Sequence, residues 1–324
     1  MKFLVTGANG FVGKALCAEL LRQGQSVRAA VRSEHAPIDD AEVVVVGTID
    51  GGTGWGAALR GIDTVIHLAA RVHVMKDKAA DPLAEFLKVN LYGTSNLAQQ
   101  AASAGVKRFV YVSSVKVNGE QTTVNRPLLE ADEPDPQDPY GMSKWRAEQD
   151  LQRIAHETGL GVVIVRPPLV YGPGVKGNFF SLLAAIDRGI PLPLAGAHNT
   201  RSLVYVGNLV DALIACATQA AAAGQTYLVS DGADVSTAML VEKIAGALGR
   251  NSRSFYLPPG LLRAAASLLG RAEQMDRLFG SLRVNDEKLR RELGWSPPYT
   301  LEQGLRATAD WYGSLRNGYN RGSS

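Results

Sequence analysis

Met1–Leu16 reads MKFLVTGANGFVGKAL, and this stretch decides the fold. A short apolar run, Phe3–Val5, is followed by Gly7, Gly10 and Gly13, and an amphipathic helix pattern begins after the second glycine. Glycines here permit a tight turn and let backbone N–H groups approach a pyrophosphate, which the positive end of the helix dipole also attracts. A tight strand-to-helix turn without a ligand would need similar glycines, and the spacing is G-x-x-G-x-x-G rather than G-x-G-x-x-G. The position between a strand pattern and a helix pattern favours dinucleotide binding.

The composition indicates a globular protein with a large core. The chain has 324 residues, 46% hydrophobic and 20% charged, and its net charge of +3 comes from dispersed basic residues, which argues against nucleic-acid binding. Cys17 and Cys216 lie in apolar helical patterns and are expected to be buried free thiols of a reducing compartment. The first strand leaves no room for a signal peptide, and no apolar run is long enough to span a bilayer. We therefore expect a cytoplasmic protein without membrane insertion.

Strand-like runs alternate with helical patterns along the first half of the chain. The runs are nearly continuous in apolar residues, as in strands that are buried on both faces of a parallel sheet. The predicted strands are Phe3–Val5, Val27–Val31, Val43–Val46, Thr64–Leu68, Phe109–Val112 and Val162–Val165, and the longest predicted helices are Pro82–Ala104 and Tyr140–Thr158. This pattern predicts an α/β fold with a doubly wound parallel sheet (Rossmann) that binds a cofactor at the carboxyl ends of its strands.

The strict alternation fades after Arg166, where short strands mix with Gly- and Pro-rich loops and helices. We expect a dinucleotide-binding domain of residues 1–166 plus about 200–229, and a smaller mixed α/β substrate-binding lobe of residues 167–199 and 230–324. Helices are predicted there at Ser236–Leu248, Leu261–Leu269 and Leu301–Tyr312.

The candidate catalytic residues follow the strand at Phe109–Val112. Ser113 and Ser114 place two hydroxyls at the cofactor edge of the sheet, and further on Tyr140 and Lys144 are spaced so that both side chains lie on one helix face. A lysine ammonium near a phenol favours the phenolate and is expected to lower its pKa, as acid–base catalysis near neutral pH requires. A chance Tyr/Lys pair on a surface helix is the alternative, and the glycines and strand-end serines argue against it.

Taken together, the motifs resemble the extended short-chain dehydrogenases/reductases of the nucleotide-sugar epimerase, dehydratase and reductase group. The resemblance extends over nearly the whole chain, through TGANGFVG, DTVIHLAA, VNLYGT, FVYVSSVKVNG, PYGMSK, VRPPLVYGPG, RSLVYVGNLVDA and KLRRELGW. It implies that Ser114, Tyr140 and Lys144 are the catalytic set, with Lys144 also holding the nicotinamide ribose and Asn90 supporting the proton relay. The cofactor-binding residues that it implies are Gly7, Asn9, Gly10, Phe11, Val12, Gly13, Arg32, Thr48, Ile49, Leu68, Ala69, Ala70, Asn90, Tyr140, Lys144 and Pro167.

The end of the second predicted strand departs from the NAD-preferring members of this group, which carry an acidic residue there. Here the segment ends at Arg32 and Ser33, which are suited to a 2′-phosphate, so we expect NADP(H), with NAD(H) possible. Arg32 could instead stack on adenine or remain solvated. Thr48 stands where the family often has an adenine-contacting Asp.

A second departure is Lys116, at the position where the dehydratases carry the carboxylate needed for elimination, which argues against dehydration. Lys116 is a candidate substrate contact, with a solvated lysine as the alternative. Asn178 and Arg201 match family positions that bind the nucleotide diphosphate, and Arg277 is a more loosely matched second contact. The histidines show no metal-ligand spacing, so no metal is expected.

The resemblance implies an oxidoreductase that acts at C4 of a UDP-sugar and forms a homodimer. We expect a 4-ketoreductase making a UDP-N-acetyl-6-deoxyamino sugar for surface polysaccharide. A UDP-glucose or UDP-N-acetylglucosamine 4-epimerase with retained NAD is the main alternative. A non-catalytic NADP-sensing or scaffold protein of the same fold is the alternative of another class, and the intact catalytic set argues against it.

Overall fold

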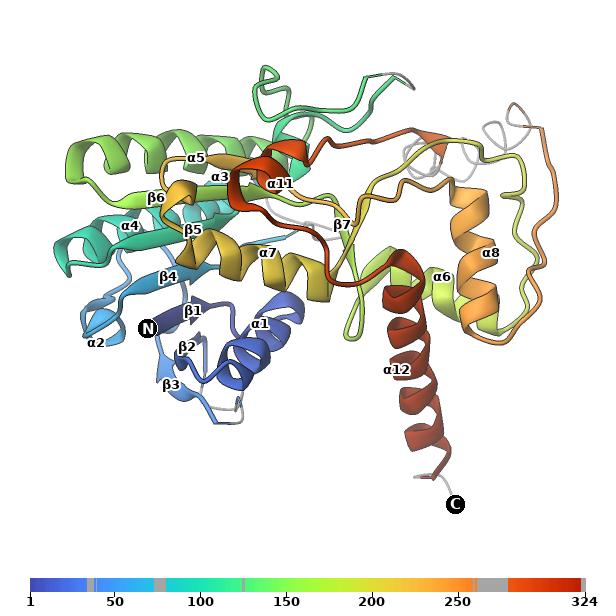
Figure 1. Ribbon diagram of the computed structural model, residues 1–324, viewed down its shortest axis with the longest axis horizontal. Helices are drawn as coiled ribbons and strands as arrows, with labels where there is room; N and C mark the ends of the chain where they lie inside the picture. Colours follow the sequence, from blue (N-terminus) through green and yellow to red (C-terminus); the bar gives the residue numbers. More distant parts are fainter. Residues whose placement is uncertain are drawn as a thin grey trace.

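A seven-stranded parallel sheet forms the centre of the computed structural model, which describes residues 1–33, 38, 40–72, 80–123, 126–258, 260 and 279–321. Its strand order is β3-β2-β1-β4-β5-β6-β9, and helices cover both faces (Figure 1). The strands are β1 (Lys2–Thr6), β2 (Ser26–Val31), β3 (Glu42–Val45), β4 (Thr64–His67), β5 (Arg108–Val112), β6 (Gly161–Arg166) and β9 (Thr226–Leu228). The predicted doubly wound parallel sheet is confirmed.

Two hydrophobic cores lie on the two faces of this sheet, because successive strand residues point to opposite sides. On β1, for example, Phe3 and Val5 belong to the first core and Leu4 to the second. Against the first core pack α1 (Phe11–Arg22), α7 (Val206–Thr218) and α11 (Glu287–Leu293). Against the second pack α2 (Gly56–Leu59), α4 (Thr94–Ser103) and α5 (Pro139–Thr158).

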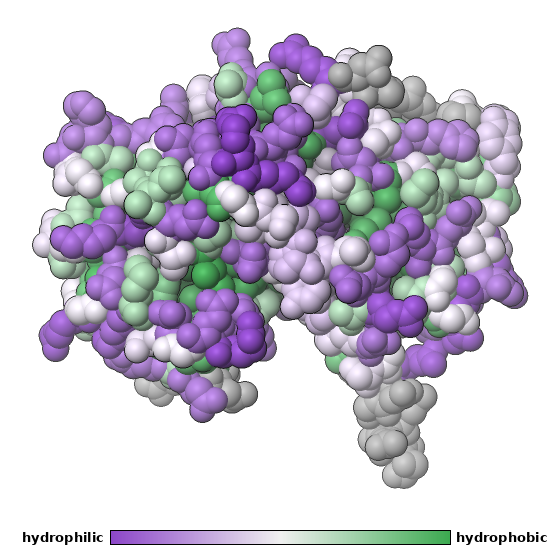
Figure 2. Space-filling model, in the orientation of Figure 1, coloured by the Kyte–Doolittle hydropathy of each residue, from purple (hydrophilic) through white to green (hydrophobic). Residues whose placement is uncertain are grey.

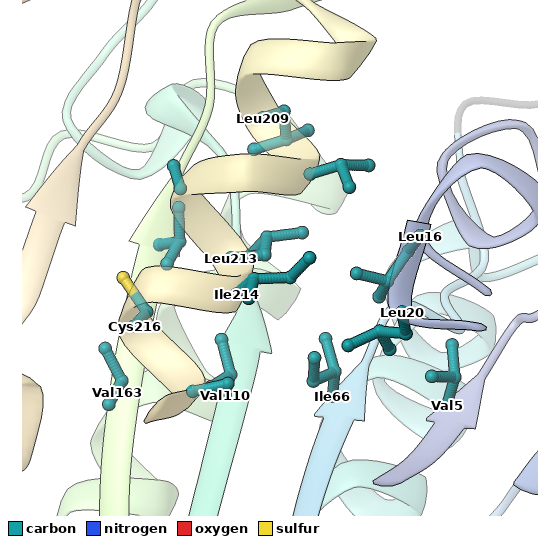
Figure 3. Close-up of a cluster of buried hydrophobic side chains, with 14 of the residues drawn as sticks. Val5, Leu16, Leu20, Ile66, Val110, Val163, Leu209, Leu213, Ile214 and Cys216 are labelled. Carbon is teal, nitrogen blue, oxygen red and sulfur yellow. The ribbon is translucent and has the colours of Figure 1, made fainter. Parts of the chain in front are cut away.

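Figure 3 shows how α7 closes the first core. Its apolar side chains, including Leu213 and Ile214, point toward Val110 and Val163 of the sheet and toward Leu16 of α1. Cys17 and Cys216 are free thiols buried in this core, and burial raises the pKa of each to about 12. Both thiols are therefore protonated and inert at neutral pH.

The predicted helix Pro82–Ala104 is one continuous run with a change of winding in its middle. It consists of α3 (Pro82–Leu87), a π-helical segment η1 (Lys88–Gly93) and α4. π-Helical turns occur mainly inside α-helices at functional sites, and this one carries Asn90. Side-chain periodicity does not reveal such a local change, so the sequence could not predict it.

The smaller lobe is built around two short parallel strands, β7 (Leu169–Tyr171) and β8 (Leu203–Tyr205). A third core joins them to α6 (Gly177–Asp187), α8 (Thr237–Ala247) and α12 (Leu301–Arg321). The predicted helices at Ser236–Leu248 and Leu301–Tyr312 correspond to α8 and to the first part of α12. The helix predicted at Leu261–Leu269 lies outside the described residues.

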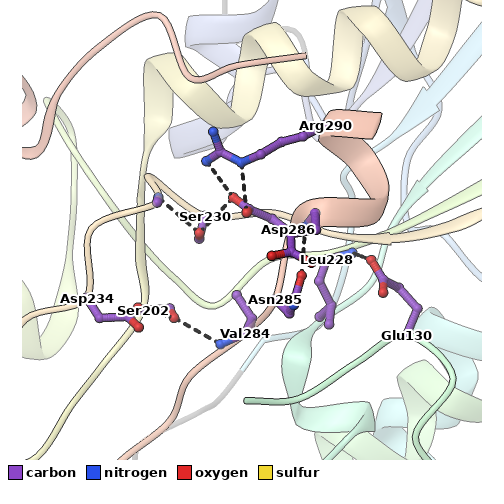
Figure 4. Close-up of polar contacts among 11 residues, drawn as sticks. Glu130, Ser202, Leu228, Ser230, Asp234, Val284, Asn285, Asp286 and Arg290 are labelled. Atoms are coloured by element: carbon purple, nitrogen blue, oxygen red, sulfur yellow. Dashed lines mark hydrogen bonds and ion pairs between the residues drawn. The ribbon is translucent and has the colours of Figure 1, made fainter. Parts of the chain in front are cut away.

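The chain returns from this lobe to the large sheet through residues 284–295. Figure 4 shows the polar contacts that fasten it: Ser202 Oγ accepts from the backbone N of Val284 at 2.9 Å, and Ser230 donates to Asp286 at 2.9 Å. Leu289 and Leu293 of α11 then pack in the first core. This stretch, which the sequence analysis assigned to the substrate-binding lobe, therefore packs on the large sheet, while the division into two lobes stays a proposal.

Hydrophilic and apolar residues are interspersed on the face that Figure 2 shows. Within the described ranges, no helix combines the length and apolarity needed to cross a membrane. The same residues contain no group of three or more His, Cys, Asp or Glu side chains able to hold a metal ion.

Candidate active site

The glycine-rich turn after β1 brings three backbone segments into direct contact. Gly7 has a φ of +65°, and a Cβ there would lie 2.9 Å from the backbone N of Ala69, after β4. A Cβ on Gly13 would lie 2.2 Å from the carbonyl oxygen of Gly7. Gly10 caps α1 without a side-chain hydrogen bond, so the first amides of α1 are available to an anion. The turn therefore fits the pyrophosphate of a dinucleotide.

The other predicted cofactor residues lie along the same edge of the sheet. Leu68, Ala69 and Ala70 follow β4 and are half-buried, and Pro167 follows β6 and is buried. Arg32 is exposed directly after β2, where a cofactor's adenosine end would lie. Of the remaining predicted cofactor residues, the exposed Asn9 and the half-buried Phe11 and Val12 lie in the glycine turn and at the start of α1. The exposed Thr48 and the half-buried Ile49 follow β3.

Ser114 lies at the carboxyl end of β5 as the N-cap of the 3₁₀ turn η2 (Val115–Val117), and its Oγ accepts from the backbone N of Lys116 at 3.3 Å. The backbone N of Val115 donates to the carbonyl of Pro167 at 3.0 Å and joins this turn to the segment after β6. The hydroxyl of the preceding Ser113 is buried and has no hydrogen-bond partner. The strand end therefore presents one hydroxyl held in place and one that is unsatisfied.

Helix α5 places Tyr140 and Lys144 next to this strand end. The helix begins at Pro139 because the Asp138 carboxylate accepts from the backbone N of Gly141 at 2.7 Å and proline is favoured in the first turn. The buried Lys144 Nζ donates to the carbonyl of Val112 at 2.8 Å and lies 5.9 Å from the centre of the Tyr140 ring. The Ser114 side chain is close enough to Tyr140 to act on the pKa of its phenol. The structure thus brings together the three predicted catalytic residues.

The pKa of Tyr140 shifts in the direction opposite to the expected one. Burial raises it to about 12, the negative charge of Asp138 adds to the rise, and the Ser114 side chain acts against it. Burial also lowers the pKa of Lys144 to about 7, opposed by Glu148. The prediction of a lowered phenol pKa was wrong because burial of the phenol, together with the nearby Asp138 charge, raises this pKa. At neutral pH the phenol is in its proton-donating form.

Asn90 holds the first turn of α5 in place through Ser143. Its Nδ2 donates to Ser143 Oγ at 2.9 Å, and Ser143 Oγ donates in turn to the carbonyl of Tyr140 at 2.7 Å. Asn90 also exchanges hydrogen bonds with the backbone of Arg71, after β4, at 2.8 and 3.0 Å. Asn90 therefore ties the first turn of α5 to the loop that borders the cofactor edge.

A buried ion pair, which the sequence analysis missed, supports α5 one turn after Lys144. Arg166, at the end of β6, bonds Glu148 of α5 at 2.5 Å, and both side chains are almost fully buried. Arg166 also donates to Asn118 Oδ1 at 3.0 Å. Asn118 is itself buried, and its amide oxygen satisfies the buried guanidinium. No local pattern in the sequence signals this pairing between distant segments.

His67, at the end of β4, is a buried structural residue. Its ring nitrogens contact Thr6 Oγ1 at 2.6 Å and Thr94 Oγ1 at 2.9 Å. Burial and, secondarily, the nearby Lys144 charge lower its pKa to about 3. His67 is therefore neutral at physiological pH and holds β1, β4 and α4 together.

The predicted substrate contacts are less closely gathered than the catalytic residues. Asn178 is exposed in the first turn of α6. Arg201, before β8, donates to the carbonyl of Gly280 at 2.9 Å; burial lowers its pKa and the charge of Glu120 opposes this. The Lys116 ammonium is paired with Glu120 and Asp138. Arg277 lies outside the described residues.

The sheet, glycine turn and Ser/Tyr/Lys set define an extended short-chain dehydrogenase/reductase. Residues 3–230 match the NAD dependent epimerase/dehydratase family, and the chain belongs to this family. Similar proteins include a UDP-glucose 4-epimerase of Vibrio cholerae, 44% identical over 97% of this chain and 96% of its own length. Another is an N-acetyl-alpha-D-glucosaminyl-diphospho-ditrans,octacis-undecaprenol 4-epimerase of Escherichia coli O157:H7, 29% identical over 95% of this chain and 94% of its own.

Among solved structures, "MoeE5 in complex with UDP-glucose and NAD" has a TM-score of 0.77 and 27% identity, covering 98% of this chain and 100% of that one. The family description and this relative indicate a nicotinamide cofactor, and both name NAD. The expectation of NADP(H) from the end of β2 finds no support in them.

Proposed function

We propose that the protein is a UDP-hexose 4-epimerase that retains its NAD. The observation that carries this proposal is the full-length similarity to a UDP-glucose 4-epimerase at 44% identity. The Ser114, Tyr140 and Lys144 arrangement supplies the acid–base group that inversion at C4 requires, at the edge of the sheet where the glycine turn would hold the dinucleotide.

The chain's own residues handle the proton at the C4 oxygen. The bound nicotinamide supplies the chemistry of accepting a hydride from C4 and returning it. In its phenolate form, which Lys144 and the positive charge of a bound nicotinamide would favour, Tyr140 takes the hydroxyl proton of C4 as the carbonyl forms. The resulting phenol gives this proton back when the carbonyl is reduced on its other face, so no proton or electron pair is lost. Ser114, at the adjoining strand end, holds the same oxygen, and Lys144 stabilises the phenolate and holds the ribose. The raised pKa of Tyr140 suits the return of the proton.

The UDP group is expected to bind on the smaller lobe. Arg201 offers a guanidinium that is largely desolvated, and desolvation strengthens hydrogen bonds to phosphate oxygens. Asn178 adds an amide at the first turn of α6. With Arg277 as a further proposed contact, these groups would hold the diphosphate while the sugar turns at C4.

Cofactor analysis tests the retained NAD. We expect purified, denatured protein to release about one NAD per chain without any added nucleotide, measured by enzymatic cycling assays specific for NAD and NADP. Protein that is free of nucleotide and titrates with NADPH alone would contradict a retained NAD and favour a reductase.

A 4-ketoreductase for a UDP-N-acetyl-6-deoxyamino sugar of surface polysaccharide is the second candidate. One observation favours it: β2 ends in Val31, followed by the exposed Arg32 and Ser33, without the acid that would hold ribose hydroxyls. If Arg32 contacts a 2′-phosphate, Arg32→Asp should weaken NADPH binding at least about tenfold, because such charge-assisted bonds contribute about 1.5–3 kcal/mol. If wild type prefers NADH, or the ratio of the two dissociation constants does not move, Arg32 does not contact this phosphate.

We further propose a cytoplasmic homodimer. In the family, the helices corresponding to the α3–α4 run and α5 pair across a two-fold axis, and here α4 and α5 pack side by side on one face of the sheet (Figure 1). Light scattering at micromolar concentration should give twice the chain mass of 34.5 kDa. A monomer under these conditions would contradict the dimer, and cell fractionation tests the location.

A further inference from the structure

The side chain of Lys116 forms a three-membered charge cluster at the start of α5. Its Nζ lies 2.6 Å from Glu120 Oε1 and also bonds Asp138 Oδ2. All three side chains are partly buried, with exposed fractions of 27% for Lys116, 22% for Glu120 and 18% for Asp138. The ammonium is thus directed at carboxylates of its own chain, in surroundings where water screens the charges only partly.

The two oxygens of Asp138 have different partners. Oδ1 caps α5 by accepting from the backbone N of Gly141 at 2.7 Å, while Oδ2 bonds the Lys116 ammonium. The main chain of Lys116 also packs on this turn, because a Cβ on Gly141 would lie 2.9 Å from the Lys116 carbonyl oxygen. Its backbone N donates to Ser114 Oγ at 3.3 Å. One residue therefore contacts the catalytic serine and the cap of the helix that carries Tyr140.

The phenol of Tyr140 is surrounded by ionisable groups from several elements. The negative charge of Asp138 raises the pKa of Tyr140. The α3 neighbour is the uncharged ring of Phe86, 6.1 Å away between centroids. The other ionisable groups near the phenol or the Asp138 carboxylate are Lys144 and Glu148 of α5, Tyr111 of β5, Lys116 and Glu120 after β5, Arg71 after β4, whose guanidinium lies over the Phe86 ring, and Arg201, which interacts with Glu120.

We propose that Lys116 is a positioning residue that neutralises the Asp138 carboxylate and thereby reduces the opposition of this charge to the phenolate that Tyr140 needs for acid–base chemistry. A carboxylate is favoured as an N-cap, but the same charge disfavours a phenolate two residues further on. The Lys116 ammonium offsets the negative charge of Asp138, and the Asp138 carboxylate still caps α5. The inference rests on the proposed function only in taking Tyr140 as the acid–base group.

The test compares four proteins with wild type: Lys116→Met, Lys116→Arg, the double variant Lys116→Met/Asp138→Asn, and Lys243→Met as a matched control. Lys243 of α8 pairs with Glu302 at the same distance of 2.6 Å, in the smaller lobe. Asparagine caps helices about as well as aspartate, so the double variant removes the charge and retains the cap. Circular dichroism verifies that each protein is folded.

Two pH titrations are measured on NAD-saturated protein. The first is the pH profile of kcat/KM with UDP-glucose. The second is the tyrosinate absorbance of each variant minus that of the same variant carrying Tyr140→Phe, which needs no turnover. Lys116→Met should move both midpoints up by about half a unit or more, as expected for loss of a charge that compensates Asp138. Both midpoints should stay within about 0.2 pH units of the wild-type values in Lys116→Arg, in the double variant and in the control.

An unchanged midpoint in Lys116→Met, or one that the double variant does not restore, would overturn the proposal. An unmoved midpoint with a KM raised about tenfold would instead identify Lys116 as a substrate contact. If wild type turns over no UDP-sugar while the absorbance midpoints shift as expected, the proposed function fails and the role of Lys116 stands.

Discussion

Replacement of Tyr140 by phenylalanine is expected to lower kcat by 10²–10⁴, the usual contribution of a general acid–base group. The Phe ring keeps the contact with Phe86, 6.1 Å away between centroids, and loses only the phenolic hydroxyl. The dissociation constant for NAD should stay within about threefold, because the glycine turn and the carbonyl-bonded Lys144 are untouched. Steady-state kinetics and a fluorescence titration with NADH measure the two quantities.

Tyr299→Phe is the matched control for this variant. Tyr299 is about half exposed beside α7, and its contacts to Asn208 use only backbone atoms, so its hydroxyl should be dispensable. Retention of more than about a tenth of the wild-type rate in Tyr140→Phe would exclude Tyr140 as the acid–base group. Wild-type protein that binds NAD but turns over no substrate would favour the sensor or scaffold alternative.

Gly13→Ala is expected to weaken NAD binding by about 10- to 100-fold, in line with the 1–3 kcal/mol typical of overpacking. The added Cβ would lie 2.2 Å from the carbonyl oxygen of Gly7 and 2.7 Å from the Cα of Ala8. Because both neighbours are backbone atoms, either the turn or the start of α1 must move away from the pyrophosphate. An NADH titration and a thermal melt measure the loss of affinity and of stability.

The control for this substitution is Gly246→Ala, in α8. A Cβ there meets nothing within 4 Å, and alanine is the better helix former, so stability should be unchanged or slightly increased. If Gly13→Ala binds NADH as wild type does, the close approach at the glycine turn is not required for the cofactor.

The sequence predicted six of the seven strands of the large sheet, and β1, β2, β4, β5 and β6 were recognisable because they are largely buried on both faces. The short strand β9 was not predicted. Runs such as Val162–Val165 and Phe109–Val112 have few polar interruptions, and the structure extends each by only a residue or two. Tyr140 and Lys144 were predictable as a pair because helical spacing alone brings them together. The glycine turn was predictable because backbone contact at Gly7 and Gly13 excludes a side chain.

What the sequence could not predict depends on contacts between distant segments. The packing of α11 into the first core requires Leu289 to cross back from the smaller lobe, and no local pattern reveals such a return. The direction of the Tyr140 pKa shift depends on the burial of the phenol and on the charge of Asp138. The pairing of Lys116 with Asp138 joins the 3₁₀ turn η2 to the start of α5, 22 residues further along the chain.

The most direct test of the central claim is the stereochemistry at C4 after incubation of the purified protein with UDP-glucose and no added cofactor. Proton NMR of the sugar should show conversion to the C4 epimer until the two forms reach equilibrium, with no deuterium at C4 when the solvent is D₂O. Epimerisation without added nucleotide requires a retained dinucleotide that returns the same hydride. No epimer from UDP-glucose or UDP-N-acetylglucosamine, together with NADPH-dependent reduction of a UDP-4-keto sugar, would contradict the account and identify a reductase.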